Sequence, residues 1–135
     1  MTERQFNTKF LHWLRTKKYV GAFELKMTKE KSLPFSALKE HQKQSLLMVK
    51  HSFLCAKIAD DSIGIKNFDV FALGNTFAYV VVQFYTRGCK DFYLIDIDEW
   101  CQLEKNSNRK SITKEEVSKI GKKYSLKTIK TSFLP

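Results

Sequence analysis

The chain has 135 residues, enough for one domain around a single core and too few for two ordinary domains. Lys and Arg number 24 against 14 Asp and Glu, and the resulting net charge of +10 is typical of proteins that bind a polyanion. Hydrophobic residues make up 43% of the chain, with only 5 Gly and 2 Pro, which excludes fibrous and low-complexity proteins.

Apolar runs and cysteines bear on the cellular location. The longest mainly apolar run, residues 77–85, is about half as long as a membrane-spanning helix, and the N-terminus lacks the apolar stretch of a signal peptide. We therefore expect a cytoplasmic protein with no membrane partner. The 3 cysteines form neither an even set nor a Cys-x-x-Cys pair, so we interpret them as reduced thiols.

Charge is distributed unevenly along the chain. Residues 1–50 hold 11 basic and 4 acidic side chains, residues 51–104 hold 4 and 8, and residues 105–135 hold 9 and 2. Two basic ends thus flank an acidic centre, which indicates that the ends contact a polyanion, with solubility alone as the alternative. We assign residues 1–104 to the core and residues 105–135 to a basic C-terminal helix and tail of the same single domain.

The first two elements are an amphipathic helix and a strand. Apolar residues at helical spacing predict the helix over residues 3–17. Alternation of side chains then predicts a strand over residues 19–28. Glu24 and Lys26 lie on one face of that strand and therefore project together.

A second helix is predicted after a polar loop, over residues 36–50, with Ser36 as its N-cap. Its apolar stripe begins at Leu38. Gln42 falls on the same stripe, four residues after Leu38, so its amide points toward the core side of the helix. A buried amide needs hydrogen-bond partners, and these are either backbone groups or the side chains of a polar site.

An unusual carboxylate lies in the next two predicted strands. Residues 53–59 and 67–73 are expected to form a hairpin around a polar turn, where Gly64 can supply a positive φ. Both faces of the second strand are apolar, yet Asp69 lies on it. A carboxylate in such a strand is costly to ionise unless a cation or hydrogen-bond donors compensate its charge. Asp69 is therefore the most anomalous residue of the chain.

The centre of the sheet is predicted from two further apolar segments. Residues 77–85 suit a central strand, and residues 91–97 suit its neighbour. We interpret Asp96, Asp98 and Glu99 as a solvated strand end. The expected fold class is α/β, with a mixed central sheet of about five strands flanked by helices.

The C-terminal part and the histidines give weaker signals. Thr113 and Glu116 have the spacing of a capping box, which predicts a basic helix that ends near residue 124. His12, His41 and His51 show no paired ligand spacing, so we interpret them as surface or structural residues.

Glu24, Lys26 and Asp69 are the residue types that a metal-dependent phosphodiesterase needs. Carboxylate oxygens hold Mg²⁺, the ion lowers the pKa of a bound water, and a nearby lysine orients that water or offsets the charge of the phosphate. Two residues along a strand span roughly 6 to 7 Å, so Glu24 could ligate a metal while Lys26 reaches the attacking water.

Two segments resemble the PD-(D/E)xK nuclease superfamily, and within it the RecU-like and phage-type Holliday junction resolvases. The first is residues 23–42, FELKMTKEKSLPFSALKEHQ, with a strand ending in Glu-x-Lys, a polar loop and a helix beginning near His-Gln. The second runs from DSIGIKNFDVFAL to AYVVVQFY and is similar to an aspartate-bearing hairpin and a central strand. Together they cover roughly residues 1–98, and the resemblance implies a restriction-endonuclease-like core.

The resemblance implies a role for each of five residues. Glu24 would be a metal ligand and Lys26 the catalytic lysine. Gln42 would lie beside the scissile phosphate or its water. Asp69 would be the second metal carboxylate, and Glu3 would match the glutamate that the family's first helix contributes to the active site.

The order of these residues departs from the family pattern. In the common order an aspartate precedes the Glu-x-Lys strand, but no acid lies between Glu3 and Glu24. The aspartate must then come from the later hairpin. If Asp69 points away from Glu24, Asp60 or Asp61 becomes the candidate to take its place.

The resemblance also implies an activity and its partners. We expect a Mg²⁺-dependent endonuclease, for which Mn²⁺ can substitute, that resolves four-way DNA junctions by paired symmetric nicks and leaves 5′-phosphate and 3′-hydroxyl ends. Paired nicks require two active sites, so a homodimer is implied; a phage-encoded member would act in the host cytoplasm. The expected DNA contacts are Lys29, Lys31, Lys39, Lys43, Lys66, Lys122 and Lys123.

Two alternatives remain open. A nicking or restriction-type endonuclease could use the same fold and the same chemistry. A non-catalytic DNA-binding protein could keep the fold and hold phosphates through the basic ends, with steep salt dependence and no turnover.

Overall fold

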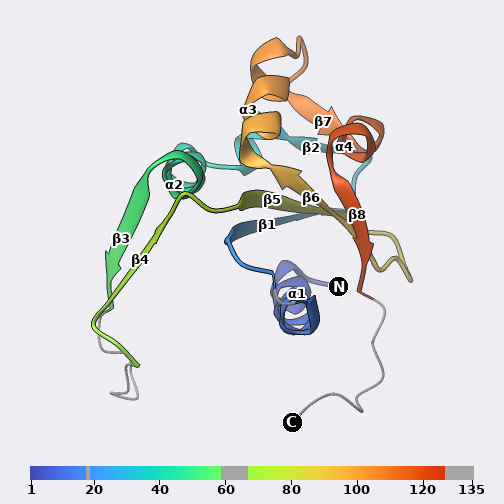
Figure 1. Ribbon diagram of the computed structural model, residues 1–135. Coiled ribbons are helices and arrows are strands. Elements are labelled where there is room, and N and C mark those ends of the chain that lie inside the picture. Colours follow the sequence, from blue (N-terminus) through green and yellow to red (C-terminus); the bar gives the residue numbers. More distant parts are fainter. Residues whose placement is uncertain (18, 59–66, 127–135) are drawn as a thin grey trace.

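The computed structural model describes residues 1–17, 19–58 and 67–126. Its centre is a four-stranded sheet with the strand order β1–β5–β6–β8 (Figure 1). Its strands are β1 (Ala22–Thr28), β5 (Ala78–Phe84), β6 (Asp91–Asp96) and β8 (Lys122–Ser125). β1 and β5 are parallel, whereas β6 is antiparallel to both β5 and β8. The predicted α/β class with a mixed central sheet is confirmed.

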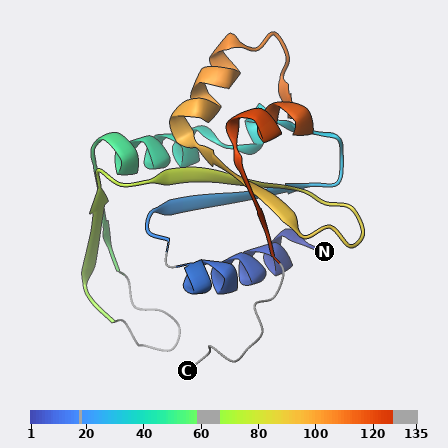
Figure 2. The same cartoon turned by 45° about the vertical axis from the view of Figure 1, so that its right-hand side comes forward.

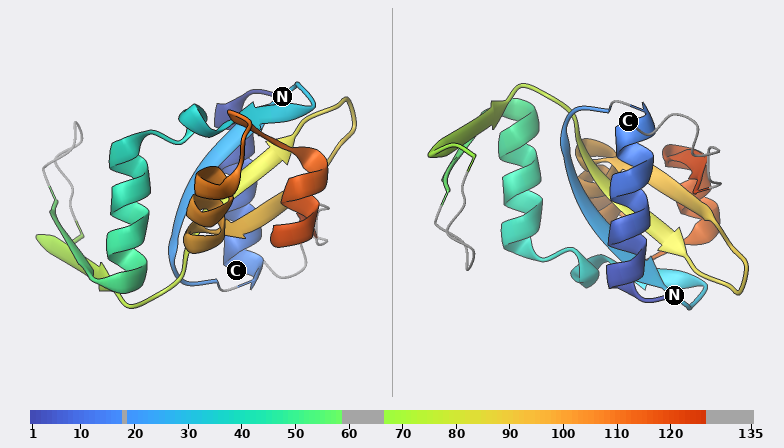
Figure 3. Two further views of the ribbon diagram at one scale, coloured as in Figure 1. Left: turned by 90° about the horizontal axis from the view of Figure 1, so that it is seen from above. Right: turned by 90° about the horizontal axis from the view of Figure 1, so that it is seen from below.

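Helices cover both faces of this sheet. Helix α1 (Glu3–Lys17) crosses one face, and α2 (Glu40–His51), α3 (Ile97–Asn106) and α4 (Lys114–Ile120) lie on the other, as the views from above and below show (Figure 3). The α1 face is packed with aromatic rings, and Phe10 contacts both Phe23 and Phe92 edge-to-face. The opposite face is built around the fully buried Trp100. The predicted first helix is confirmed at both ends. No helix of the described residues is both long and apolar enough to cross a membrane.

The predicted hairpin forms, but it lies outside the central sheet. Strands β3 (Phe53–Lys57) and β4 (Val70–Gly74) pair only with each other among the described residues. The central sheet therefore has four strands where about five were expected, because the hairpin forms a two-stranded sheet of its own and β8 takes a place in the central sheet. The hairpin instead projects from the end of α2, toward the side of the sheet that α1 covers (Figures 1 and 2).

The second helix begins later than predicted. Ser36 lies in the short 3₁₀ helix η1 (Phe35–Ala37), and Lys39 is the N-cap of α2. The preceding segment is held in place by a small second sheet of β2 (Ser32–Pro34) and β7 (Ser111–Thr113). Burial of Phe35 against Trp100 explains why the chain turns here before the long helix starts.

The predictions after residue 96 need two further corrections. Asp96 is the last residue of β6, but the acidic residues after it belong to α3 rather than to a strand end, because Asp96 is also the N-cap of α3 and accepts a hydrogen bond from the backbone of Asp98. The predicted capping box of Thr113 and Glu116 does start α4, but that helix ends at Ile120 rather than near residue 124. Gly121 follows as its C-cap, and Lys122–Ser125 form β8, so the C-terminal segment contributes a strand to the central sheet.

Candidate active site around Glu24

Three of the predicted site residues meet at one carboxylate oxygen. The Nε2 atom of Gln42 donates to Oε1 of Glu24 over 2.9 Å, and Nζ of Lys26 lies 3.2 Å from the same oxygen. The side chains of Lys26 and Glu24 are 12% and 31% exposed, so both are partly screened from water. The alternation of β1 places this pair on the α2 side of the sheet, while Phe23 faces α1. The shared face predicted for Glu24 and Lys26 is confirmed.

The amide of Gln42 has two hydrogen-bond partners. One is a backbone group and the other is a polar side chain, the two kinds of partner that the sequence left open. Its Oε1 atom accepts from the backbone N–H of Lys39 over 3.0 Å, which caps the start of α2. Its Nε2 group is thereby turned toward Glu24. The cap fixes the orientation of the amide, because the oxygen is occupied by a donor and the nitrogen must face the acceptor.

Glu24 and Gln42 form part of the wall of a pocket at the edge of the sheet. The pocket has a volume of about 210 Å³ and lies between β1, which is an edge strand, the helix α2 and the start of β3. Its polar lining consists of Glu24, Gln42, His41 and Ser45, and Leu54 marks its boundary toward the hairpin. His41 was interpreted as a surface residue, and it is exposed, but it also lines the pocket. Its position next to Gln42 on the same helix was the available signal.

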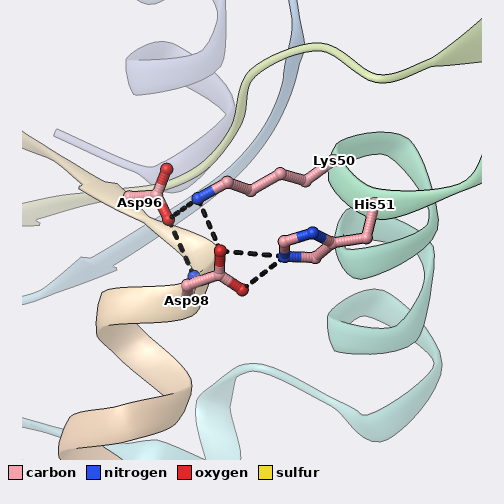
Figure 4. A network of polar contacts seen from close by, with 4 residues as sticks. All are labelled: Lys50, His51, Asp96 and Asp98. Atoms are coloured by element: carbon pink, nitrogen blue, oxygen red, sulfur yellow. Dashed lines mark hydrogen bonds and ion pairs between the residues drawn. The ribbon is translucent and has the colours of Figure 1, made fainter.

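A polar cluster holds the far end of α2 against α3 (Figure 4). The Nζ atom of Lys50 lies 2.6 Å from Oδ1 of Asp96 and 2.6 Å from Oδ2 of Asp98. The Nε2 atom of His51 lies 2.8 Å from both carboxylate oxygens of Asp98. Asp96 thus both caps the N-terminus of α3 and accepts a hydrogen bond from the ammonium of Lys50. Because α2 carries Gln42, this clamp of Lys50, His51, Asp96 and Asp98 helps to position the pocket.

The charges of the clamp stabilise one another. Burial disfavours the charged form of Asp98, but hydrogen bonds from Lys50 and His51 outweigh it and hold the pKa of Asp98 below its usual value. Burial likewise disfavours the Lys50 ammonium, and the two aspartates outweigh it and raise the pKa of Lys50. Both ions therefore persist over a wider range of pH than they would in water.

Asp69 does not lie in the Glu24 pocket. It is exposed and precedes β4 by one residue, where its carbonyl accepts from the backbone N–H of Ile58 over 2.7 Å. Leu54 lines the pocket, and Ile58, the partner of Asp69, lies four residues further along the chain, a path of about 13 Å in an extended strand. The expected burial of Asp69 between apolar faces is wrong because the hairpin stands apart from the sheet that would have covered it.

Glu3 is also remote from the pocket. It begins α1, which covers the opposite face of the sheet, and its side chain is exposed. The proposed substitutes Asp60 and Asp61 lie outside the described residues. Within the part of the chain that the structure describes, no group of three or more His, Cys, Asp or Glu side chains is placed to hold a metal ion. Mg²⁺ is commonly held by one or two carboxylates together with substrate phosphates, so one chain, with Glu24 alone in the pocket, fits the ion only in part.

The lysines predicted to contact DNA fall into separate groups. Lys29, Lys31 and Lys39 are exposed in the segment between β1 and α2; Lys39 is the N-cap of the helix that lines the pocket, whereas Lys29 and Lys31 follow the end of β1 that is farther from it. Lys122 and Lys123 are exposed on β8, the other edge of the sheet, and Nζ of Lys123 lies 3.4 Å from Oδ2 of Asp91. Two further predicted contacts are Lys43, whose ammonium binds Glu40 and Glu104, and Lys66, which lies outside the described residues.

The pocket combines groups that bind and polarise an oxyanion. The Lys26 ammonium and the Gln42 amide N–H₂ flank the Glu24 carboxylate, and Glu24 and Gln42 line an opening large enough for a phosphate-sized group. Comparisons with protein-family models, with curated proteins and with solved structures found no match to this chain. The functional proposal therefore depends on the residues of this pocket and on the charge around it.

Proposed function

We propose that this chain is a structure-selective endodeoxyribonuclease that resolves four-way DNA junctions. The observation that carries the proposal is the meeting of Lys26 and Gln42 on Oε1 of Glu24, beside a pocket at the sheet edge that Glu24 and Gln42 line. Gln42 is 18 residues from Glu24 and comes from a different element. The resemblance to the PD-(D/E)xK nucleases implies these three residues as a unit, and this geometry supports that interpretation.

Each residue of the pocket has a distinct task in phosphodiester hydrolysis. Lys26 would contact a non-bridging oxygen and offset the charge that develops on the phosphate, where partial exclusion of water strengthens the interaction. Gln42 would use the second N–H of its fixed amide to donate to the phosphate or its attacking water. Mg²⁺, for which Mn²⁺ can substitute, is the proposed cofactor, and Glu24 is its proposed ligand; such an ion supplies positive charge and an acidified water.

The charge of the surroundings suits a DNA substrate. The net charge is +10, and three exposed lysines lie in the segment that connects β1 to α2, the two elements that carry Glu24 and Gln42. Phosphate contacts of this kind provide affinity without sequence preference, which is what a protein that selects DNA by shape requires. Resolution of a four-way junction needs two cuts, so the proposed active form is a homodimer.

The deciding experiment measures cleavage of labelled DNA in Mg²⁺ and in Mn²⁺. A synthetic four-way junction, a fork and a linear duplex are each incubated with the wild type and with Lys26→Ala. Lys105→Ala, which removes an exposed lysine from the last turn of α3, is the matched control. We expect paired symmetric nicks in the junction alone, loss of at least 100-fold in rate for Lys26→Ala with retained binding, and a wild-type rate for the control.

Two other results would redirect the proposal. Cleavage of all three substrates would favour a nicking or restriction-type endonuclease with the same chemistry. Tight binding without cleavage in either metal would contradict the enzyme proposal and favour a non-catalytic DNA-binding protein. The incomplete carboxylate set of the pocket is the observation that favours this second candidate.

A further inference from the structure

A pair of tyrosine hydroxyls lies on the α1 face of the sheet, opposite the face that carries the Glu24 pocket. The hydroxyl of Tyr19, from the segment between α1 and β1, lies 2.5 Å from that of Tyr124 on β8. Their rings meet edge-to-face, and Trp13 stacks against Tyr19 and also contacts Tyr124. Packing therefore fixes both phenols, while each remains partly exposed to water.

One proton of this pair has no protein acceptor. Each phenol has a single O–H to donate, so within the pair one hydroxyl donates and the other accepts. The accepting hydroxyl finds no further partner among the described residues. The hydrogen bond with Tyr124, together with burial, raises the pKa of Tyr19, so this phenol keeps its proton at neutral pH. The pair thus offers an O–H donor to a ligand that can accept it.

Two lysines with no ion-pair partner lie near these hydroxyls. Lys17 is in the last turn of α1, and Lys122 is the first residue of β8. The positive charges of both act on the hydroxyl of Tyr19. Alternation along β8 places Lys122 on the same face as Tyr124. Both lysines are exposed, and neither forms an ion pair within the described part of the chain. Two ammonium groups and a hydroxyl donor therefore surround a position that suits an anion.

Helix α1 extends this positive surface. It exposes Arg4, Lys9 and Arg15, and Glu3 is its one acidic residue. A helix of 15 residues is about 22 Å long, so its cations can contact several phosphates of one strand. A row of cations suits a polymer of phosphates better than a single free phosphate. The large aromatic residues of α1 are buried against the sheet, which leaves no broad apolar face to insert into a membrane.

We propose that the Tyr19–Tyr124 pair, with Lys17 and Lys122, binds a backbone phosphate of one DNA arm while the Glu24 pocket holds another arm. The two surfaces lie on opposite faces of the central sheet. Duplex DNA is stiff over about 150 base pairs, so one linear helix cannot contact both faces of so small a domain, whereas two arms of a junction can. Binding on both faces favours branched over linear DNA. The inference rests on the proposed function, which supplies the junction as substrate.

The first test measures binding without cleavage. Fluorescence anisotropy in EDTA compares a labelled four-way junction with a linear duplex over a series of salt concentrations. Lys17→Gln combined with Lys122→Gln should lower the slope of log affinity against log salt concentration by about 2 for the junction. The slope for the duplex should change little, because a duplex can still bind on the pocket side.

The matched control removes the same amount of charge elsewhere. Lys123 follows Lys122 on β8 but lies on the other face of the strand, where its Nζ is 3.4 Å from Oδ2 of Asp91. Lys123→Gln combined with Lys105→Gln, in the last turn of α3, should leave both slopes nearly unchanged. Only the lysines near the tyrosine pair should therefore distinguish the junction from the duplex.

A second variant tests the hydroxyls at constant charge. Tyr19→Phe combined with Tyr124→Phe keeps both rings in the aromatic cluster and removes both O–H donors. Affinity for the junction should fall about tenfold, as expected for a lost hydrogen bond to a charged group, with an unchanged circular dichroism spectrum. Tyr79→Phe removes a phenol from the same face of the sheet and is the matched control, which should bind as the wild type does.

The outcomes separate this site from the proposed function. If the wild type cuts the junction but the Lys17 and Lys122 variant keeps its slope, or loses as much slope on the duplex, binding on both faces is wrong and the nuclease proposal stands. If removal of both hydroxyls leaves junction affinity unchanged, the tyrosine site is wrong. If the Lys17 and Lys122 variant loses binding only to phosphatidylglycerol vesicles, the surface serves a membrane instead. If the expected slopes are found but the wild type cuts in neither Mg²⁺ nor Mn²⁺, the nuclease proposal fails and the tyrosine site stands.

Discussion

Gly21 determines how the chain enters β1, three residues before Glu24. Its φ is +151°, a conformation that glycine adopts easily and other residues rarely do. A Cβ atom at this position would lie 2.5 Å from the carbonyl oxygen of Phe77, which also accepts from the backbone N–H of Ala22 over 2.9 Å. The absence of a side chain thus lets β1 approach the segment that leads into β5.

Gly21→Ala should be strongly destabilising. It combines backbone strain with a clash against main-chain atoms, and we expect a loss of about 2–5 kcal/mol in the free energy of unfolding, measured by urea denaturation. Gly88→Ala is the matched control, because Gly88 also has a positive φ, +81°, but no atom lies within 4 Å of its added Cβ. That variant should lose only the strain, about 1–2 kcal/mol. Equal losses in the two variants would show that the contact with Phe77 is unimportant.

The clamp between α2 and α3 should make stability depend on pH. The pKa of Asp98 is lowered in the folded state, so its contribution is present above the pKa of the unfolded chain and is lost as pH falls through the folded value. The pKa of Lys50 is raised, so its contribution is present below the pKa of the unfolded chain and is lost as pH rises through the folded value. Both contributions are present together around neutral pH.

Asp98→Asn tests this dependence. We expect a loss of about 1 kcal/mol in the free energy of unfolding at neutral pH, because the clamp is partly exposed, and a difference that closes at strongly acidic pH. Glu99→Gln removes the same charge from the same turn of α3 and controls for the helix dipole. A difference between Asp98→Asn and the wild type that stays constant from neutral to acidic pH would contradict the electrostatic explanation.

At the level of elements, local patterns in the sequence predicted local structure well. The shared face of Glu24 and Lys26 followed from alternation along one strand, and the start of α4 followed from the Thr113–Glu116 capping box. Asp96 does end β6, but its role as the N-cap of α3 was missed, although an aspartate followed by acidic residues is also the pattern of a helix N-cap. The sequence is compatible with a strand end and with a helix N-cap. In the structure Asp96 accepts a hydrogen bond from the backbone of Asp98, as an N-cap residue does.

At the level of the whole molecule, the predictions that differ from the structure concern which strands pair with one another. A two-residue period predicts strands but does not say which edges they join, so the β3–β4 hairpin was placed in the central sheet. β8 is short and mostly polar, and its strand conformation comes from pairing with β6 rather than from its own residues. The predicted burial of Asp69 was wrong for the same reason, since it depended on a sheet that the hairpin does not join.

Charge is the property of the whole molecule that leads to the last prediction. Lys29 and Lys31 are exposed between β1 and β2, just beyond the strand that carries Lys26. Each lysine that contacts a DNA phosphate releases a counterion and adds about 0.9 to the slope of log affinity against log salt concentration. The double variant Lys29→Gln and Lys31→Gln should therefore bind a four-way junction more weakly, and its salt slope should be smaller by about 2.

Fluorescence anisotropy with a labelled junction, in EDTA and at a series of salt concentrations, measures this slope directly. Lys43→Gln is the matched control, because its ammonium lies 3.1 Å from Oε2 of Glu40 and 3.0 Å from Oε1 of Glu104 and is already neutralised. It should change the slope little, although the predicted contacts included it. If Lys43→Gln lowers the slope as each of the other two lysines does, phosphate competes successfully with the two glutamates. If the double variant keeps the wild-type slope, the DNA follows another basic surface, and Lys122 on β8 becomes the next residue to change.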